Sequence, residues 1–158
     1  LYAWEHYGYK PDIVTSAKGL GNGLPIGACL CTEELGNVLT AGTHGSTFGG
    51  NPIVCAGAAE VLRCLDEKML AAVAEKGGYL KAKLEAFDEV DSVRGKGLMI
   101  GVKLKSKAAK EVAAKCVENG LLILTAKEYL RLLPPLVITY DEIDKGLAIL
   151  EKVLKDSD

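Results

Sequence analysis

The sequence is poor in histidine, one of the residues from which metal sites are built. It has only two histidines, His6 and His44, among 158 residues. Cys29 and Cys31 are separated by one residue, whereas redox and zinc pairs are separated by two. No Cys/His set of recognised spacing can be assembled, so we expect no metal site.

Long apolar runs and a strong excess of one charge are also missing. No run approaches the 18 apolar residues of a membrane-spanning helix. A net charge of -2 gives no electrostatic footprint for nucleic acid or for a membrane surface. We expect a cytoplasmic protein without a signal peptide, whose five cysteines are buried free thiols in a reducing compartment.

A glycine-rich stretch after Ile13 and Val14 is the most informative segment. These two β-branched residues indicate a buried strand, and Lys18 follows it directly. Glycines at every second position from Gly19 to Gly23 permit positive φ and a close approach of other groups. The stretch lacks both the dinucleotide-binding and the P-loop glycine patterns. Lys18 is therefore either an exposed turn lysine or an amine that forms a Schiff base with a carbonyl compound.

Two further polar positions allow both a structural and a binding interpretation. Ser46 and Thr47, in a loop of glycine and small residues, could bind a phosphate or could satisfy local backbone groups. Arg131 stands among leucines, where a guanidinium needs a partner. That partner could be a carboxylate within the fold or an anionic ligand.

Three ordered motifs resemble segments of the class III (ornithine-type) pyridoxal-phosphate aminotransferases. They are TSAKGLGNGLPIGA at residues 15–28, GSTFGGNP at residues 45–52 and LRLLPPL at residues 130–136. The resemblance implies an α/β chain that is the C-terminal part of a fold-type I enzyme. It also implies three parts: a remnant of the large domain (1–58), a helical link (59–87) and a small α/β domain (88–158).

The resemblance also implies roles for individual residues. Lys18 would hold the cofactor pyridoxal 5'-phosphate and act as the catalytic acid and base. Thr47 would bind the cofactor phosphate, and Ser46 the substrate, of the other subunit in a homodimer. Arg131 would bind the substrate carboxylate, whereas Arg94 is interpreted as structural. The phosphate-binding loop and the aspartate that pairs with the cofactor's ring nitrogen in this family are expected to lie upstream of this chain.

The activity implied is transfer of an amino group between N-acetylornithine and 2-oxoglutarate, as in arginine biosynthesis. Ornithine and 4-aminobutyrate are alternative donors. A chain without catalysis, serving only in dimerisation or packing, is the third possibility. Small-molecule amino-acid and 2-oxo-acid substrates are expected in either catalytic case, with no nucleic acid or membrane partner.

Local patterns predict most of the secondary structure. They indicate strands at 26–32 and 98–104, a buried central strand at 121–124, and helices at 33–39 and 69–87. A further helix would begin at the Asn51-Pro52 pair. Ser106 would cap a helix that ends at Glu118, and Thr139 with Glu142 would form the capping box of the last helix. The alternation of strands and helices predicts an α/β sandwich with a mixed sheet.

Overall fold

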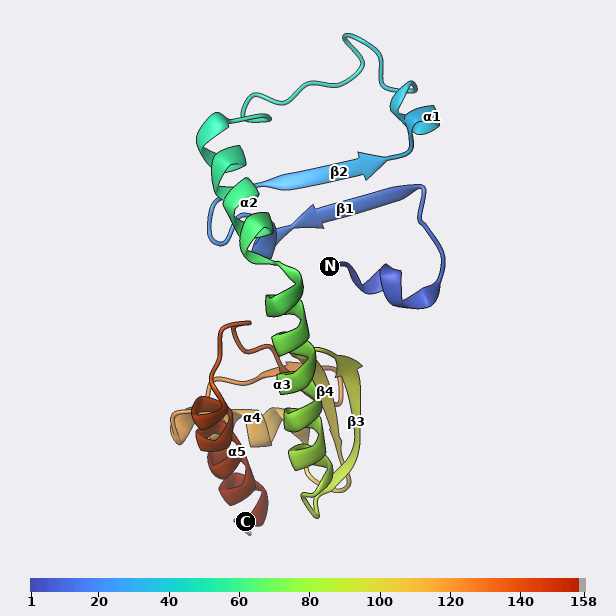
Figure 1. Ribbon diagram of the computed structural model, residues 1–158. Coiled ribbons are helices and arrows are strands. Elements are labelled where there is room, and N and C mark those ends of the chain that lie inside the picture. Colours follow the sequence, from blue (N-terminus) through green and yellow to red (C-terminus); the bar gives the residue numbers. More distant parts are fainter. Residues whose placement is uncertain (157–158) are drawn as a thin grey trace. The chain divides into compact units, whose positions relative to one another are not determined.

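The computed structural model describes residues 1–156, which fall into two compact units. Unit 1 contains residues 1–68, and unit 2 begins at Met69. Each unit has its own sheet (Figure 1). None of the helices within these residues is both long and apolar enough to cross a membrane.

Unit 1 is built on a two-stranded antiparallel sheet. Its elements are the 3-10 helices η1 (Ala3–Tyr7) and η2 (Lys18–Leu20), the strands β1 (Ile13–Ala17) and β2 (Gly27–Cys31), and the helices α1 (Glu33–Gly36) and α2 (Pro52–Cys64). Ala17 lies opposite Gly27 in the register, so the segment 18–26 is the connection between the two strands.

The strands of unit 1 were predicted to be buried, and this prediction was wrong for the chain as it stands. Ile13 is 55% exposed and Leu30 is 48% exposed. Of the described residues of this unit, only Gly21 and Ala58 are buried. Four of the five cysteines, predicted to be buried thiols, are exposed; only Cys116 of unit 2 is buried. A strand is buried only when another layer covers its face, and the described residues supply no such layer here.

Unit 2 contains a four-stranded sheet and three helices. Its elements are α3 (Glu67–Glu85), β3 (Val90–Lys96), β4 (Met99–Leu104), α4 (Ala109–Glu118), β5 (Leu124–Ala126), β6 (Tyr129–Leu132) and α5 (Tyr140–Lys155). The strand order is β3-β4-β6-β5, and every pairing is antiparallel. The prediction of a mixed sheet was therefore wrong.

The apolar run 121–124 was predicted to be a central strand, and this was also wrong. The strand β5 begins only at Leu124 and lies at the edge of the sheet. Leu122 is 87% exposed, while Ile123 is buried. A continuous apolar run does not by itself distinguish a central strand from a connection.

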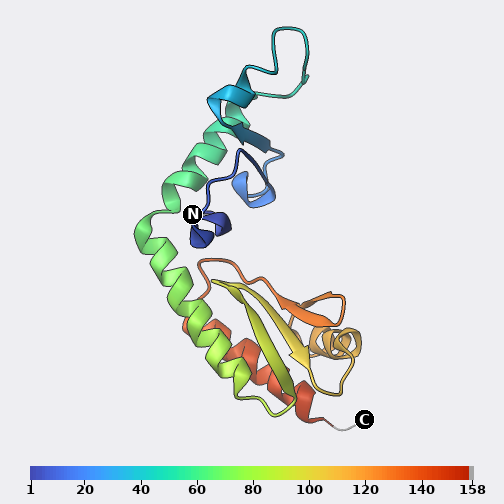
Figure 2. The ribbon, with the colours of Figure 1, turned by 90° about the vertical axis from the view of Figure 1, so that its right-hand side faces the viewer.

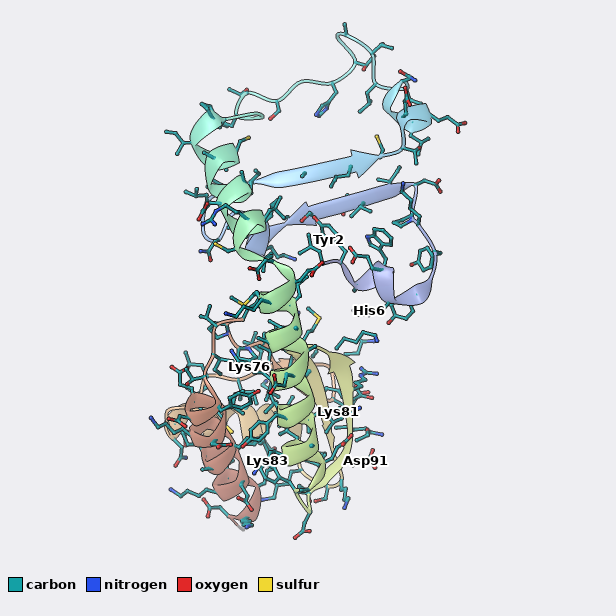
Figure 3. The ribbon with its side chains drawn as sticks, in the orientation of Figure 1. Tyr2, His6, Lys76, Lys81, Lys83 and Asp91 are labelled. Atoms are coloured by element: carbon teal, nitrogen blue, oxygen red, sulfur yellow. The ribbon has the colours of Figure 1, made fainter. Side chains whose placement is uncertain are left out.

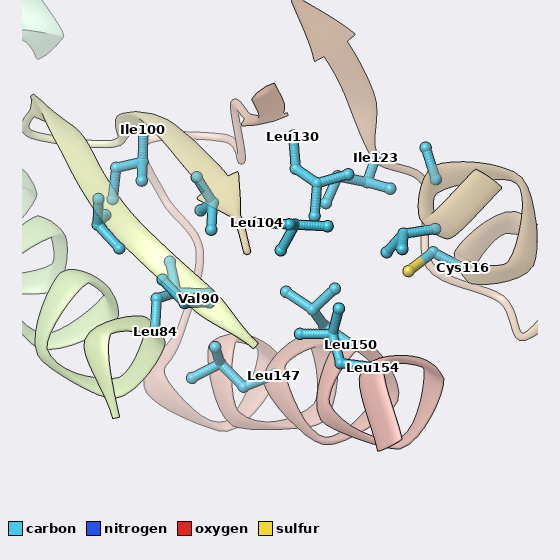
Figure 4. Close-up of a cluster of buried hydrophobic side chains, with 14 of the residues drawn as sticks. Leu84, Val90, Ile100, Leu104, Cys116, Ile123, Leu130, Leu147, Leu150 and Leu154 are labelled. Atoms are coloured by element: carbon cyan, nitrogen blue, oxygen red, sulfur yellow. The ribbon is translucent and has the colours of Figure 1, made fainter. Parts of the chain in front are cut away.

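The helices of unit 2 cover one face of its sheet, and the core lies between them. Figure 2 shows α3 and α5 on the same side of the sheet. Val102 and Leu130 on the covered face are fully buried, as is Leu84 of α3. Figure 4 shows these layers meeting, with Leu150 of α5 in the same cluster. Within residues 1–156, all buried apolar residues except Ala58 belong to this unit.

The predicted helix caps were right in two cases and wrong in one. Asn51 accepts hydrogen bonds from the backbone N–H groups of Ile53 and Val54, and Pro52 opens α2. Thr139 and Glu142 form the expected capping box of α5. Ser106 does not cap α4, because its hydroxyl donates to the Glu89 carboxylate (2.8 Å) and the helix begins at Ala109.

Candidate functional site

Lys18 stands where strand β1 ends, as the sequence predicted. Its backbone is left-handed, with φ of 53°. This conformation is uncommon for a residue with a side chain, and such residues collect at functional sites. The Lys18 side chain is exposed, and within residues 1–156 nothing is hydrogen-bonded or ion-paired to its amine. The amine is thus accessible, but this chain does not desolvate it.

The glycines after Lys18 have different reasons to be glycine. Gly23 has φ of 103°, which disfavours a side chain. A Cβ at Gly21 would lie 2.1 Å from the carbonyl oxygen of Leu24, so the turn closes only without it. Gly19 shows neither constraint in this chain. The turn that follows Lys18 is therefore shaped by two of the three glycines.

The loop that carries Ser46 and Thr47 precedes helix α2, and α2 packs against the turn that follows Lys18. The loop leads directly into the Asn51 cap of α2, and Figures 1 and 2 place it on the β2 side of the sheet. Further along α2, Gly57 faces Leu24, since a Cβ at Gly57 would lie 2.5 Å from the Leu24 side chain. The helix thus packs against the connection that begins at Lys18.

Ser46 and Thr47 are both exposed, and they differ in what they bind. The Ser46 hydroxyl accepts a hydrogen bond from the backbone N–H of Gly49 (3.0 Å). This bond is of the local kind that turn hydroxyls commonly make. Thr47 has no such bond to the described residues, so its hydroxyl is available to an external acceptor.

Arg131 lies in the middle of β6 and is half-buried. One interpretation of the sequence was an ion pair within the fold. Within residues 1–156, however, neither a hydrogen bond nor an ion pair joins its guanidinium to another residue. A half-buried guanidinium with five donors and no internal carboxylate favours an external anion as its partner.

A cavity of about 640 Å³ in unit 2 includes Arg131 in its lining. Most of the lining is apolar and comes from the 121–124 segment, the two prolines after β6 and the first half of α5. Glu142 is the one acidic residue that lines it. The Glu142 carboxylate accepts bonds from the Thr139 backbone N–H and hydroxyl (2.8 Å each), and these bonds lower its pKa. Glu142 is therefore engaged in the helix cap.

Lys18, Ser46 and Thr47 all belong to unit 1, whereas Arg131 belongs to unit 2. No hydrogen bond within the described residues joins Lys18 to Ser46 or Thr47. The four residues are therefore candidates at separate positions of this chain. Their functional roles remain predictions.

Arg94 and Tyr129 form a contact that the sequence patterns did not predict. The guanidinium carbon of Arg94 lies 3.7 Å from the centroid of the Tyr129 ring. The two residues are far apart in sequence and meet because β3 and β6 both pair with β4. The glycine between them, Gly101, was the available signal, because a glycine within a strand often marks a close approach.

Comparisons with known proteins agree with the three motifs. The family model of aminotransferase class-III matches residues 1–154. The acetylornithine aminotransferase of Lactococcus lactis is 48% identical over 160 residues, which cover 98% of this chain and 42% of that protein.

Solved structures give the same result for the fold. The acetylornithine aminotransferase of Elizabethkingia anophelis has a TM-score of 0.85 at 34% identity, over 96% of this chain and 40% of that one. An ornithine aminotransferase of Toxoplasma gondii, described with partial occupancy of PLP at its active site, has a TM-score of 0.83 at 34% identity, over 94% and 38%. The predicted fold class is confirmed, and the chain spans about two fifths of the length of these relatives.

Proposed function

The chain belongs to the class-III aminotransferase family, and on this premise we propose that it is part of a pyridoxal-phosphate-dependent aminotransferase. The proposed reaction moves an amino group between N-acetylornithine and 2-oxoglutarate, a step of arginine biosynthesis. The donor is proposed because relatives at 43–48% identity are acetylornithine aminotransferases. The proposed place of action is the cytoplasm.

The observation that carries the proposal is the amine of Lys18. It is exposed at the end of β1, on left-handed backbone, with no partner in the part of the chain described. These features fit a lysine that binds an aldehyde cofactor covalently, because such an amine must be reachable and free. The burial that would activate it as a base has to come from residues outside this chain.

The remaining candidates also fit the chemical groups of the cofactor and substrate. When bound, pyridoxal phosphate supplies an aldehyde that condenses with amines and a ring that accepts electrons from a breaking C–H bond. The Lys18 amine would accept the proton from the substrate carbon that bears nitrogen. It would then donate the proton to the cofactor carbon to which the nitrogen is transferred. The Thr47 hydroxyl would donate to a phosphate oxygen. Arg131 would hold the substrate carboxylate with two parallel hydrogen bonds.

A homodimer is part of the proposal. Ser46 and Thr47 lie in an exposed loop and would reach the site of the other subunit. Phe48 beside them is 84% exposed, and Ile53 is 74% exposed. Apolar side chains this exposed are typical of a surface that another chain covers. Residues 1–58 would then belong to the large domain, 59–87 would link the domains and 88–158 would form the small domain.

Borohydride reduction tests the role of Lys18. The protein is mixed with one equivalent of pyridoxal phosphate, reduced and digested, and the labelled peptides are measured by mass spectrometry. We expect the label mainly on Lys18, and loss of that label in Lys18→Arg. Lys10→Arg, which changes another exposed lysine of unit 1, is the matched control. Equal labelling of Lys10 and Lys18 would contradict the proposal.

Donor selectivity tests the proposed substrate. The whole protein that contains this chain is assayed with 2-oxoglutarate and, in turn, N-acetylornithine, ornithine and 4-aminobutyrate. We expect the highest kcat/KM for N-acetylornithine. A preference for ornithine is the alternative favoured by the fold similarity to ornithine aminotransferases. Binding of the cofactor without transfer from any donor would instead favour a non-catalytic relative.

A further inference from the structure

Two of the four asparagines in the chain are followed directly by glycine. Asn22-Gly23 lies in the connection between β1 and β2, and Asn119-Gly120 follows helix α4. Leucine comes next at both sites, so each reads Asn-Gly-Leu. The two pairs therefore have nearly the same local chemistry, and a large difference in their reactivity has to come from the fold.

An asparagine before glycine can lose its side-chain amide without an enzyme. The backbone nitrogen of the glycine gives up its proton and attacks Cγ of the asparagine, which is easiest beside glycine because no Cβ hinders the approach. A C–N bond forms, the Cγ–Nδ2 bond breaks, and the side-chain nitrogen leaves as ammonia with that proton. Water then opens the cyclic imide at either C–N bond, its hydroxyl going to the carbonyl carbon and its hydrogen to the nitrogen. The product is aspartate or isoaspartate.

The reactive atoms of Asn22 and Gly23 are exposed and unengaged within residues 1–156. In that part of the chain the Asn22 side-chain amide makes no hydrogen bond, and the Gly23 N–H donates none. The pair forms the centre of a turn that is closed by a bond from the Leu24 N–H to the Gly21 carbonyl (3.0 Å). Positive φ at both central residues, 45° and 103°, is the pattern for which Asn-Gly is preferred. The pair that suits this turn thus leaves both reacting groups free.

Asn119 and Gly120 are exposed as well, but their reactive atoms are hydrogen-bonded. Nδ2 of Asn119 donates to the carbonyl of Lys115 (2.9 Å), and its Oδ1 accepts from Nζ of Lys152 (3.2 Å). The Gly120 N–H donates to the carbonyl of Val117 (3.0 Å). Attack by the Gly120 nitrogen would first have to break bonds of this set. Hydrogen bonding, and not exposure, therefore distinguishes the two sites.

The turn at Asn22 is tied to Lys18 by overlapping backbone hydrogen bonds. The Gly21 N–H donates to the Lys18 carbonyl (3.1 Å), and the Asn22 N–H donates to the Gly19 carbonyl (3.2 Å). Figure 3 shows this turn at the end of β1, beside α2. An aspartate in place of Asn22 adds a negative charge, which opposes an anionic phosphate group. An isoaspartate also lengthens the backbone of a turn that closes only because Gly21 lacks a Cβ.

We propose that Asn22 is a site of spontaneous deamidation, and that the carboxylate formed there lowers the covalent binding of pyridoxal phosphate to Lys18. The first part rests on the chemistry of the turn alone. The second part rests on the proposed function, because it requires that Lys18 binds the cofactor.

Mass spectrometry of the protein aged in water enriched in heavy oxygen measures both sites in the same molecule. Each reacted site carries the heavy oxygen in place of its side-chain nitrogen. We expect Asn22 of the folded protein to react about 10-fold faster than Asn119 or more, the ratio expected where hydrogen bonds must break before the attack. In protein unfolded with guanidinium chloride the ratio should fall toward one, because the local sequences match.

Three results would show that Asn22 is not a preferred site. They are equal rates at the two sites in the folded protein, a faster reaction at Asn119, and a ratio that stays the same in the unfolded chain. In the last case the residues before each asparagine, and not the fold, would set the rates.

Reductive labelling of Lys18 tests the second part of the proposal. Asn22→Asp should lower the labelled fraction at limiting pyridoxal phosphate by about 2- to 5-fold, the effect of one exposed charge. Asn119→Asp adds the same charge to unit 2 and should have no effect. Ageing should lower the labelling in the unsubstituted protein but not in Asn22→Gln, because the longer side chain would have to close a larger ring.

The two parts fail in different ways. If Lys18 is not labelled in the fresh, unsubstituted protein, the proposed function and the effect on the cofactor are both wrong, whereas the rates at Asn22 and Asn119 still decide the deamidation. If Asn22→Asp and the unsubstituted protein are labelled equally at Lys18, only the effect on the cofactor is wrong. Circular dichroism of each variant establishes that it is folded.

Discussion

Unit 1 and unit 2 differ in what their residues are used for. Unit 2 holds all but one of the buried apolar residues in the described part of the chain, and its helices cover one face of its sheet. Unit 1 contains Lys18, Ser46 and Thr47, but most of its large apolar side chains are exposed. The comparison teaches that the residues proposed for the cofactor lie where this chain provides little stability of its own. Unit 2 can be expected to dominate cooperative unfolding of the chain.

Matched leucines on the two sheets give the strongest test of this comparison. Leu130 in unit 2 is fully buried, and Leu30 in unit 1 is 48% exposed. Leu130→Ala should lower the free energy of unfolding by about 2–5 kcal/mol through lost burial and a cavity. Leu30→Ala should change it by less than about 0.5 kcal/mol, as surface substitutions do. Urea unfolding followed by circular dichroism measures both, and equal losses would break the comparison.

Two adjacent glycines in a single helix of unit 2 give a second test of how burial determines stability. A Cβ at Gly77 of α3 would lie 2.2 Å from the carbonyl oxygen of Gly97, whereas a Cβ at Gly78 meets nothing within 4 Å. Gly77→Ala should destabilise by about 1–3 kcal/mol through overpacking. Gly78→Ala should stabilise by about 0.5–1 kcal/mol through helix propensity. The same unfolding measurement applies, and a stable Gly77→Ala would show that α3 can move away from the sheet.

A carboxylate in unit 2 should make its stability depend on pH. Glu89 accepts hydrogen bonds from the backbone N–H of Lys107 and from the backbone N–H and hydroxyl of Ser106, and these lower its pKa. A pKa lowered by folding adds stability above the unfolded-state value, near 4.5, and this stability is lost as pH falls through the folded-state value.

Thermal unfolding between pH 3 and pH 7 measures this dependence. Glu89→Gln should flatten the fall in Tm at the acidic end. The control is Glu60→Gln in unit 1, where an ion pair with Arg63 on α2 also lowers the carboxylate pKa. It should leave the unfolding profile unchanged, because α2 contributes little to the core. A changed profile would show that unit 1 unfolds together with unit 2.

The smallest expected effect concerns the hairpin before Arg131. Lys127 lies between β5 and β6 with φ of 55°, a left-handed conformation that glycine adopts more easily. Lys127→Gly relieves the strain of this conformation but also raises the conformational entropy of the unfolded chain. The net result should be an increase of about 0.5 kcal/mol in the free energy of unfolding. Lys18, one of two left-handed non-glycine residues of unit 1, provides the contrast, since Lys18→Gly should not move the unfolding midpoint. A loss of stability in Lys127→Gly would contradict the strain at this turn.

Sequence patterns predicted the features that depend on neighbours in the chain. The caps at Asn51 and Thr139 were correct because a cap forms between residues two or three positions apart. The prediction for Ser106 failed because its hydroxyl donates a hydrogen bond to the carboxylate of Glu89, a residue distant in sequence. The burial of β1 and β2 was also wrong, because burial depends on a covering layer and not on the strand itself.

The three motifs and their order were sufficient to assign the family, because glycines, prolines and single polar residues at fixed spacing are specific in themselves. The amino-acid order also determined where Lys18 stands, at the end of a strand. Only the tertiary structure decided that Arg131 has no carboxylate partner within residues 1–156 and that Arg94 lies over the ring of Tyr129. These relations arise from the register of three antiparallel strands. A shift of one residue in that register would place each side chain on the other face.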